Sequence, residues 1–185
     1  AIDVFLAADE TRPALLVEEG LADGASLFPY AIGELALWVP GLEGDASACE
    51  SWLKTSVDGR FAVANPRTAP YGEAAQQVLE KLSLAEQLNS RLVQGENIGQ
   101  TFLFVDSSAA QGGFVARSQL IAKQKKGDAI PGCIWRPELE YYSAIRQDAV
   151  ILMAAVENSD AYTFIDWLQS EYARSLIRRH GYRLP

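Results

Sequence analysis

Residue types that commonly carry chemistry are scarce in this chain of 185 residues. It has one histidine, His180, and two cysteines, Cys49 and Cys133. Two cysteines allow one disulfide but no zinc site of the usual spacing, and the sequence leaves a disulfide and two free thiols both open. His180 follows Arg178 and Arg179 at the end of an expected helix, where capping explains it better than general-base catalysis.

Motifs for catalysis and for metal binding are also missing. The sequence contains no Gly-rich phosphate loop, no nucleophile elbow and no cluster of metal ligands. Asp106, Asp160 and Glu171 stand near expected helix ends and turns, and their positions do not suggest an acid/base pair. We therefore expect a binding protein rather than an enzyme, without a cofactor or a bound metal.

Long apolar runs and strong basic patches are absent as well. No window approaches the roughly 18 consecutive apolar residues of a membrane-spanning helix. No signal peptide is recognisable, which leaves a cytosolic protein or an exported one whose leader has been removed. The formal net charge of -8 argues against a nucleic-acid surface, and the basic clusters at 123–126 and 178–180 are explained by a solvated loop and a helix end.

The residues that are present support a folded α/β protein. Hydrophobic residues make up 49% of the chain and charged residues 22%, enough for a core in one domain or two small lobes. Predicted strands alternate with predicted helices, which is typical of an α/β fold with largely parallel sheets. The predicted strands are 3–7, 28–39 as one strand or two joined at a bend near Gly33, 61–63, 112–116 and 133–135. Helices are predicted at 47–54, 72–82 and 84–92. Two more are defined by their ends, one capped by Thr11 and ending at Gly20 and one from Asn97 through Val105. A helical turn capped by Ser118 and two helices that close the chain complete the prediction.

Two apolar segments, 28–39 and 142–152, indicate where the chain crosses between structural units. Such crossings predict a middle lobe inserted into a discontinuous outer lobe. We expect residues 1–32 and 150–185 to form the outer lobe and residues 33–149 the inserted middle lobe.

Two turns that each lead into a helix are the most informative local feature. They are residues 65–73, NPRTAPYGE, and residues 95–100, GENIGQ. The first N–H groups of a helix have no intrahelical partner and carry the positive end of the helix dipole, so they can bind an anion. Asn97 is a suitable N-cap for the second helix. Two such starts facing one cleft could hold an oxyanion without a charged side chain.

These turns belong to a set of motifs that follows one order along the whole chain. The motifs are DVFLAADE at 3–10, YAIG at 30–33, NP at 65–66 with APYG at 69–72, ENIGQ at 96–100, GFVA at 113–116 and GYRLP at 181–185. In this order and spacing the chain resembles the periplasmic molybdate-binding proteins, which are substrate-binding components of ATP-driven (ABC-type) oxyanion importers.

The resemblance implies a fold, a ligand and a site. The fold is the two-lobed periplasmic-binding-protein type II fold, in which each lobe is a mainly parallel sheet flanked by helices. The ligand is molybdate, and also tungstate, bound between the lobes and delivered to the membrane permease of an ABC importer. By matching position, Tyr71 and Ile98 donate backbone N–H groups, and Pro70, Gly72 and Asn97 shape the two turns. The resemblance further implies a periplasmic monomer that binds neither metal nor nucleic acid.

The resemblance also implies a segment before Ala1. Members of the family open with a strand and a Ser-rich turn that supply hydroxyl ligands from the outer lobe, and no serine of this chain matches those positions. We expect an incomplete outer lobe and a fragment of a longer protein, because an open sheet edge beside residues 3–7 would promote aggregation. We expect the chain by itself to bind its ligand weakly or not at all.

Two alternatives remain open at this point. One is the ligand-sensing effector domain of a LysR-type transcriptional regulator, which has the same two-lobed fold. The other is a truncated relative specific for another oxyanion such as sulfate. A helix-turn-helix in the same gene would favour the regulator, and the family motifs favour the transport protein.

Overall fold

The computed structural model describes residues 2–55 and 57–185 and divides into two compact α/β units. The first unit extends to Gly33 and resumes at Ile145, and the second comprises Glu34–Ala144. Strands and helices alternate along the chain, so the expected α/β class is confirmed. The predicted segment 28–39 is two strands rather than one, because the chain leaves the first sheet at Gly33 and joins the second at Leu35.

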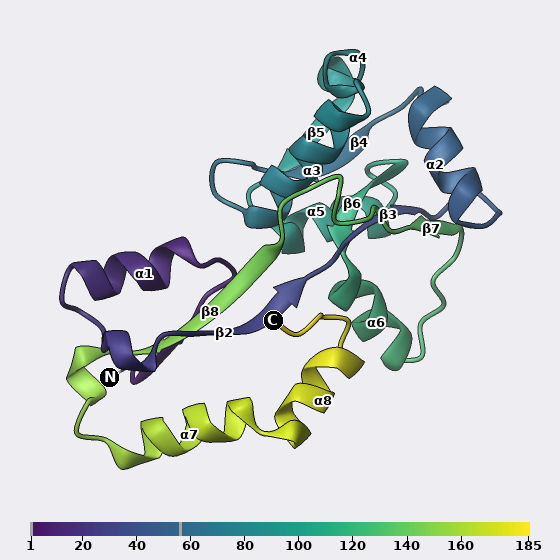
Figure 1. Cartoon of the computed structure of the whole chain (residues 1–185). Helices are drawn as coiled ribbons and strands as arrows, with labels where there is room; N and C mark the ends of the chain where they lie inside the picture. The colour runs from purple at the N-terminus through teal and green to yellow at the C-terminus, as the bar shows by residue number, and fades with distance from the viewer. Residues whose placement is uncertain (1, 56) are drawn as a thin grey trace. The chain divides into compact units, whose positions relative to one another are not determined.

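The sheet of the first unit has three strands in the order β1 (Val4–Leu6), β8 (Ile145–Ile151) and β2 (Phe28–Gly33) (Figure 1). Both pairings are antiparallel. The connectivity explains the direction of the β2–β8 pair, because β2 carries the chain out of the unit and β8 brings it back. These three strands therefore differ from the mainly parallel sheet that we expected in each lobe.

Three α-helices accompany this sheet, α1 (Thr11–Glu18), α7 (Ser159–Gln169) and α8 (Glu171–Arg179), together with short 3-10 turns at Gly24–Ser26 and Met153–Ala155. Figure 1 shows α1 on one side of the sheet and α7 and α8 on the other. Ile151 of β8 packs against Ile165 and Leu168 of α7 in the buried core of this unit. The two closing helices predicted from the sequence are confirmed.

The start of α1 differs from the prediction. Thr11 is the first residue of the helix rather than its cap, and Glu10 occupies the N-cap position. The carboxylate of Asp9 accepts a hydrogen bond from the Arg12 N–H at 2.8 Å. An aspartate two residues upstream of the expected cap therefore satisfies an N–H of the first turn.

The second unit contains a mixed sheet of five strands. Their order is β5 (Leu92–Gly95), β4 (Phe61–Ala64), β6 (Gly112–Ala116), β3 (Leu35–Val39) and β7 (Cys133–Trp135). β4 is parallel to β5 and β6, whereas β3 is antiparallel to β6 and β7. The helices of this unit are α2 (Ala46–Thr55), α3 (Pro70–Lys81), α4 (Ala85–Leu88), α5 (Ile98–Asp106) and α6 (Arg117–Lys125). Phe61 and Phe114 meet edge to face in the core, with ring centroids 5.5 Å apart.

Two local predictions for this unit are wrong. The helix expected at 84–92 is the short helix α4, a 3-10 turn at Asn89–Arg91 and the start of β5. Pairing with β4 explains the strand, because tertiary pairing overrides the propensity of a short apolar run. Ser118 does not cap α6, because it is the second residue of that helix and Ala116 holds the N-cap position.

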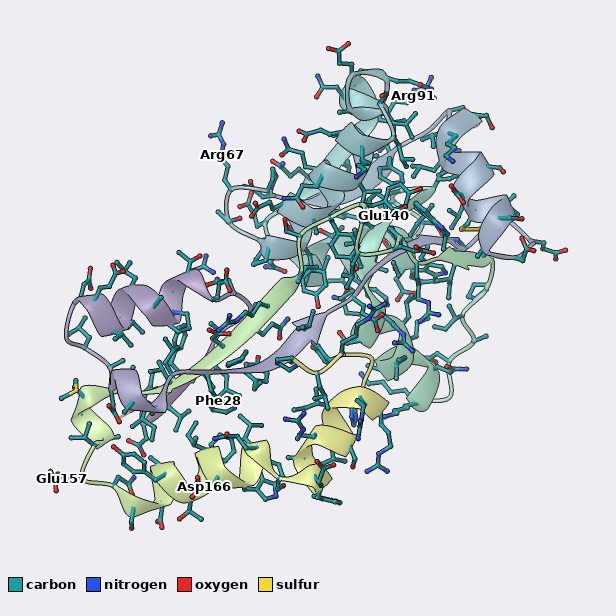
Figure 2. All side chains as sticks on the ribbon, viewed as in Figure 1. Phe28, Arg67, Arg91, Glu140, Glu157 and Asp166 are labelled. Atoms are coloured by element: carbon teal, nitrogen blue, oxygen red, sulfur yellow. A yellow bond between two sulfur atoms is a disulfide. The ribbon has the colours of Figure 1, made fainter. Side chains whose placement is uncertain are left out.

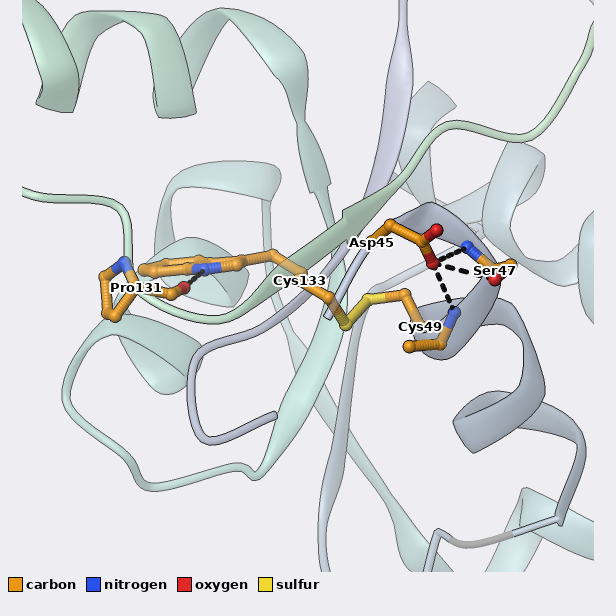
Figure 3. The surroundings of a disulfide bond; sticks show 7 residues. Asp45, Ser47, Cys49, Pro131 and Cys133 are labelled. Atoms are coloured by element: carbon orange, nitrogen blue, oxygen red, sulfur yellow. Dashed lines mark hydrogen bonds between the residues drawn. A yellow bond between two sulfur atoms is a disulfide. The ribbon is translucent and has the colours of Figure 1, made fainter. Parts of the chain in front are cut away.

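A disulfide joins Cys49 of α2 to Cys133 of β7, with Cα atoms 5.6 Å apart (Figure 3). Of the two alternatives left by the sequence, the disulfide is therefore the correct one. In Figure 3 the carboxylate of Asp45 also accepts hydrogen bonds from the N–H groups of Ser47 and Ala48, which caps α2 at the same place. The bridge thus ties a capped helix to the edge strand of the sheet.

Candidate functional site

Two parallel neighbouring strands each lead directly into a helix at the same edge of the second unit's sheet. β4 ends at Ala64 and is followed by α3, and β5 ends at Gly95 and is followed by α5. Ala64 and Gly95 are paired in register. The carboxyl edge of parallel strands is where ligands bind in open α/β sheets, because helix N-termini converge there.

Direct hydrogen bonds hold the two turns together. The N–H of Asn65 donates to the carbonyl of Gly95 at 2.8 Å, and the hydroxyl of Thr68 donates to the carbonyl of Glu96 at 3.1 Å. The side chain of Asn65 accepts a bond from the N–H of Arg67 and so shapes its own turn. The two turns singled out in the sequence, about 30 residues apart, are therefore neighbours within one unit.

The start of α5 is capped by Asn97. This residue has an extended backbone, with φ -150° and ψ 171°, and its side-chain oxygen accepts from the Gln100 N–H at 2.9 Å. The side chain of Gln100 in turn accepts from the Glu96 N–H at 2.7 Å. The N-cap role of Asn97 is confirmed. Within residues 2–55 and 57–185, no hydrogen bond described for this helix start uses the N–H of Ile98 or Gly99 as donor.

The start of α3 is packed tightly against the end of β4. Pro70 is the first helical residue, where its lack of an N–H costs no intrahelical bond, and Tyr71 is the second residue and is buried. A Cβ atom on Gly72 would lie 2.4 Å from the carbonyl oxygen of Ala64. The glycine is therefore required by a close approach of helix to strand, not by an unusual backbone angle.

A third helix, α6, starts at the same edge after β6, and the N–H groups of its N-cap position and of its first residue are bonded to protein groups. The Ala116 N–H donates to the side-chain oxygen of Gln119 at 3.0 Å, and the Arg117 N–H donates to the carbonyl of Glu34 at 2.9 Å. The Arg117 guanidinium also pairs with the buried carboxylate of Glu34. Sequence reasoning missed Glu34, Arg117 and Gln119, because their partners lie far apart in the chain.

Arg67 is the one cationic residue in the sequence of the two turns, residues 65–73 and 95–100. Arg67 lies on the loop before α3 and extends outward from the ribbon (Figure 2). In the described part of the chain, no group of three or more histidine, cysteine, aspartate or glutamate side chains could hold a metal ion. What the two helix starts can offer an anion is therefore backbone N–H groups and the dipoles of α3 and α5.

A cleft of the second unit lies beside these turns. It has a volume of about 860 Å³ and is lined mainly by polar side chains of α3, of β5 and of the loop between β4 and α3, among them Arg67, Glu73 and Gln94. Neither Tyr71 nor Ile98 lines it. We therefore do not assign this cleft to the anion.

The chain leaves one α/β unit, forms a second unit and returns to the first, and it brings helix N-termini together at one sheet edge. These are features of a solute-binding protein. The family described as bacterial extracellular solute-binding protein matches residues 1–183. The chain belongs to this family. No helix among the described residues has the length and apolar character needed to cross a membrane.

Two relatives are similar over nearly the whole chain. The molybdate-binding protein ModA of Azotobacter vinelandii is 43% identical over 184 residues, which is 98% of this chain and 71% of that protein. The protein of the same name from Rhodobacter capsulatus is 40% identical over 97% of this chain and 68% of its own length. The resemblance inferred from the motifs is thereby confirmed.

Solved structures agree with the fold. The periplasmic molybdate-binding protein of Azotobacter vinelandii superimposes with a TM-score of 0.87 and 38% identity, over 99% of this chain and 78% of that one. The substrate-binding domain of an ABC transporter from Clostridium difficile gives a TM-score of 0.74 at 22% identity, over 99% of this chain and 77% of that domain, which supports the fold alone. The chain is thus a periplasmic binding protein of type II fold and not an enzyme.

Proposed function

We propose that this protein binds molybdate and delivers it to the membrane permease of an ABC importer. The observation that carries the proposal is the convergence of the starts of α3 and α5 on one sheet edge. The names of relatives at 43% and 40% identity support the choice of anion. Tungstate is included, because it is a tetrahedral dianion of nearly the same size and would make the same contacts.

In this proposal the second unit contributes the backbone N–H groups of Tyr71 and Ile98. Pro70, Gly72 and Asn97 support them by fixing the first turn of each helix. Neutral amides that are already oriented stabilise a dianion without a strong ion pair, so the anion can be released again. Discrimination among tetrahedral anions then depends on the size of the cavity.

The direct test is a titration of the protein, expressed from its complete gene, with molybdate, tungstate, sulfate and phosphate. Binding is read from tryptophan fluorescence and from the thermal unfolding midpoint, because a ligand that binds only the folded state raises that midpoint. We expect molybdate and tungstate to bind in the micromolar range or tighter, and sulfate and phosphate much more weakly. Stabilisation by sulfate alone would correct the substrate, and no response to any of the four would contradict the proposal.

Delivery is a separate claim with its own test. A molybdate ABC importer of the source organism, with its permease and ATPase subunits, is reconstituted in lipid vesicles, and ATP hydrolysis is measured with and without the binding protein and molybdate. We expect hydrolysis to rise when the loaded binding protein is added. An unchanged rate would contradict delivery to that permease while leaving anion binding intact.

A further inference from the structure

Gln119 connects the starts of two helices at the proposed anion site. It is the third residue of α6, and its side-chain N–H donates to the carbonyl of Ile98 in α5 at 3.0 Å. Its side-chain oxygen accepts from the N–H of Ala116, the N-cap position of α6, also at 3.0 Å. The amide side chain of Gln119 therefore accepts a hydrogen bond at the start of α6 and donates one to the first turn of α5.

The first of these two bonds acts on the peptide group that joins Ile98 to Gly99. A donor on the carbonyl of a peptide withdraws electron density from that group, so its N–H becomes a stronger donor. The N–H of this peptide belongs to Gly99, and together with the N–H of Ile98 it stands at the positive end of α5. The bond from Gln119 also fixes the plane of this peptide, and with it the direction in which the Gly99 N–H points.

The second bond engages one N–H group at the start of α6. The Gln119 oxygen accepts from the Ala116 N–H and the Glu34 carbonyl accepts from the Arg117 N–H, so two N–H groups at the start of α6 are bonded to protein groups. At the start of α5, the hydrogen bonds among the described residues use the N–H groups of Glu96 and Gln100 and not those of Ile98 and Gly99. Gln119 thus removes one donor from α6 and strengthens one on α5.

We propose that Gln119 is a positioning residue of the anion site, which orients and polarises the Ile98–Gly99 peptide and makes the Gly99 N–H a further donor to the bound oxyanion. This inference rests on the proposed function. It assigns to Gln119 no contact with the anion itself.

Three variants separate this role from general support of the fold. Gln119→Met keeps the length of the side chain but removes both hydrogen bonds. Gln119→Glu keeps the acceptor for Ala116 and places a carboxylate oxygen against the Ile98 carbonyl in place of a donor. Gln124→Met makes the same chemical change at an exposed position of the same helix and serves as the matched control. Each is titrated with molybdate between pH 5.5 and 8, with the wild type as reference at every pH to account for protonation of the anion.

We expect Gln119→Met to weaken molybdate binding about tenfold, which corresponds to one hydrogen bond, and Gln124→Met to leave it unchanged. We expect Gln119→Glu to bind more weakly than Gln119→Met at pH 8, because the carboxylate repels the carbonyl oxygen. As the pH falls toward the range in which a carboxyl group takes up a proton, Gln119→Glu should recover relative to Gln119→Met, because the protonated carboxyl can again donate. In the unliganded protein, the amide proton resonance of Gly99 should move upfield in Gln119→Met.

Other outcomes would overturn the inference. Binding by Gln119→Met within twofold of the wild type would do so, as would equal weakening of both variants at all pH values with no change in the Gly99 resonance. A wild type that binds none of the oxyanions is a different result, because it removes the proposed function and this inference with it before any variant is compared.

Discussion

The proposal that backbone N–H groups bind the anion can be tested at Ile98 with the least damage to the fold. Ile98 is the first residue of α5, and Asn97 before it has an extended backbone, so a proline at position 98 suits both the helix and the preceding residue. Tyr71 is less suitable, because it follows Pro70 and a second proline would force Pro70 out of its helical conformation.

We expect Ile98→Pro to weaken molybdate binding by about tenfold to a hundredfold, because it removes one hydrogen bond to a charged ligand. Ile98→Val, which keeps the N–H, should weaken it far less. The measurement is a fluorescence or calorimetric titration, with the thermal midpoint as a control for folding. Equal affinities of the two variants would show that the Ile98 N–H does not contact the anion.

Gly72 gives a prediction about stability. Alanine is favoured over glycine inside a helix, but here the new methyl group would meet the Ala64 carbonyl at 2.4 Å. We expect Gly72→Ala to lower the free energy of unfolding by about 1–3 kcal/mol, as overpacking does. Gln76→Ala, at an exposed position of the same helix, should change it by less than about 0.5 kcal/mol. Denaturant unfolding measures both, and a stabilising Gly72→Ala would contradict the close approach.

How much of the site could be predicted also depends on the residue. The cap at Asn97 could be read from the sequence, because an N-cap and its helix are adjacent in the chain. Gln119 could not, since its bond to Ile98 spans 21 residues. Glu34 could not either, because its partner Arg117 is 83 residues away. No local pattern contains these pairs, and tertiary structure alone brings them together.

Among the elements, α2 and β7 are joined by the disulfide between Cys49 and Cys133, which are 84 residues apart and buried. A bridge that closes so long a loop restricts the unfolded chain, and its loss from a small exported protein costs about 2–5 kcal/mol. We expect a reductant to lower the thermal unfolding midpoint. The double variant Cys49→Ala with Cys133→Ala should show the lowered midpoint without reductant and no further change with it. An equal midpoint for the oxidised and reduced protein would contradict a stabilising role.

Elements were predicted best where propensity and tertiary pairing agree. The predicted strands at 61–63, 112–116 and 133–135 are all present, because each is an apolar run with a partner on the sheet. β5 was missed because Leu92–Gly95 follows directly on a helical pattern. Its strand character comes from its pairing with β4, which periodicity alone does not reveal.

At the scale of the whole molecule, the alternation of strands and helices predicted the α/β class, but it did not predict the direction of the strands. In the first unit β2 and β8 are antiparallel because they carry the chain out of and back into that unit. The second sheet becomes mixed for a related reason, since β3 enters it antiparallel to β6. Only β4, β5 and β6 keep the parallel arrangement that brings helix starts to one edge.

The central claim concerns this edge of the second sheet. It is that backbone N–H groups at the starts of α3 and α5 bind an oxyanion. The most direct measurement follows the backbone amide resonances of Tyr71 and Ile98 in isotope-labelled protein during a titration with molybdate. We predict that both amide protons move downfield, with the same saturation curve as the tryptophan fluorescence. Binding of molybdate with no change at either amide would contradict the account.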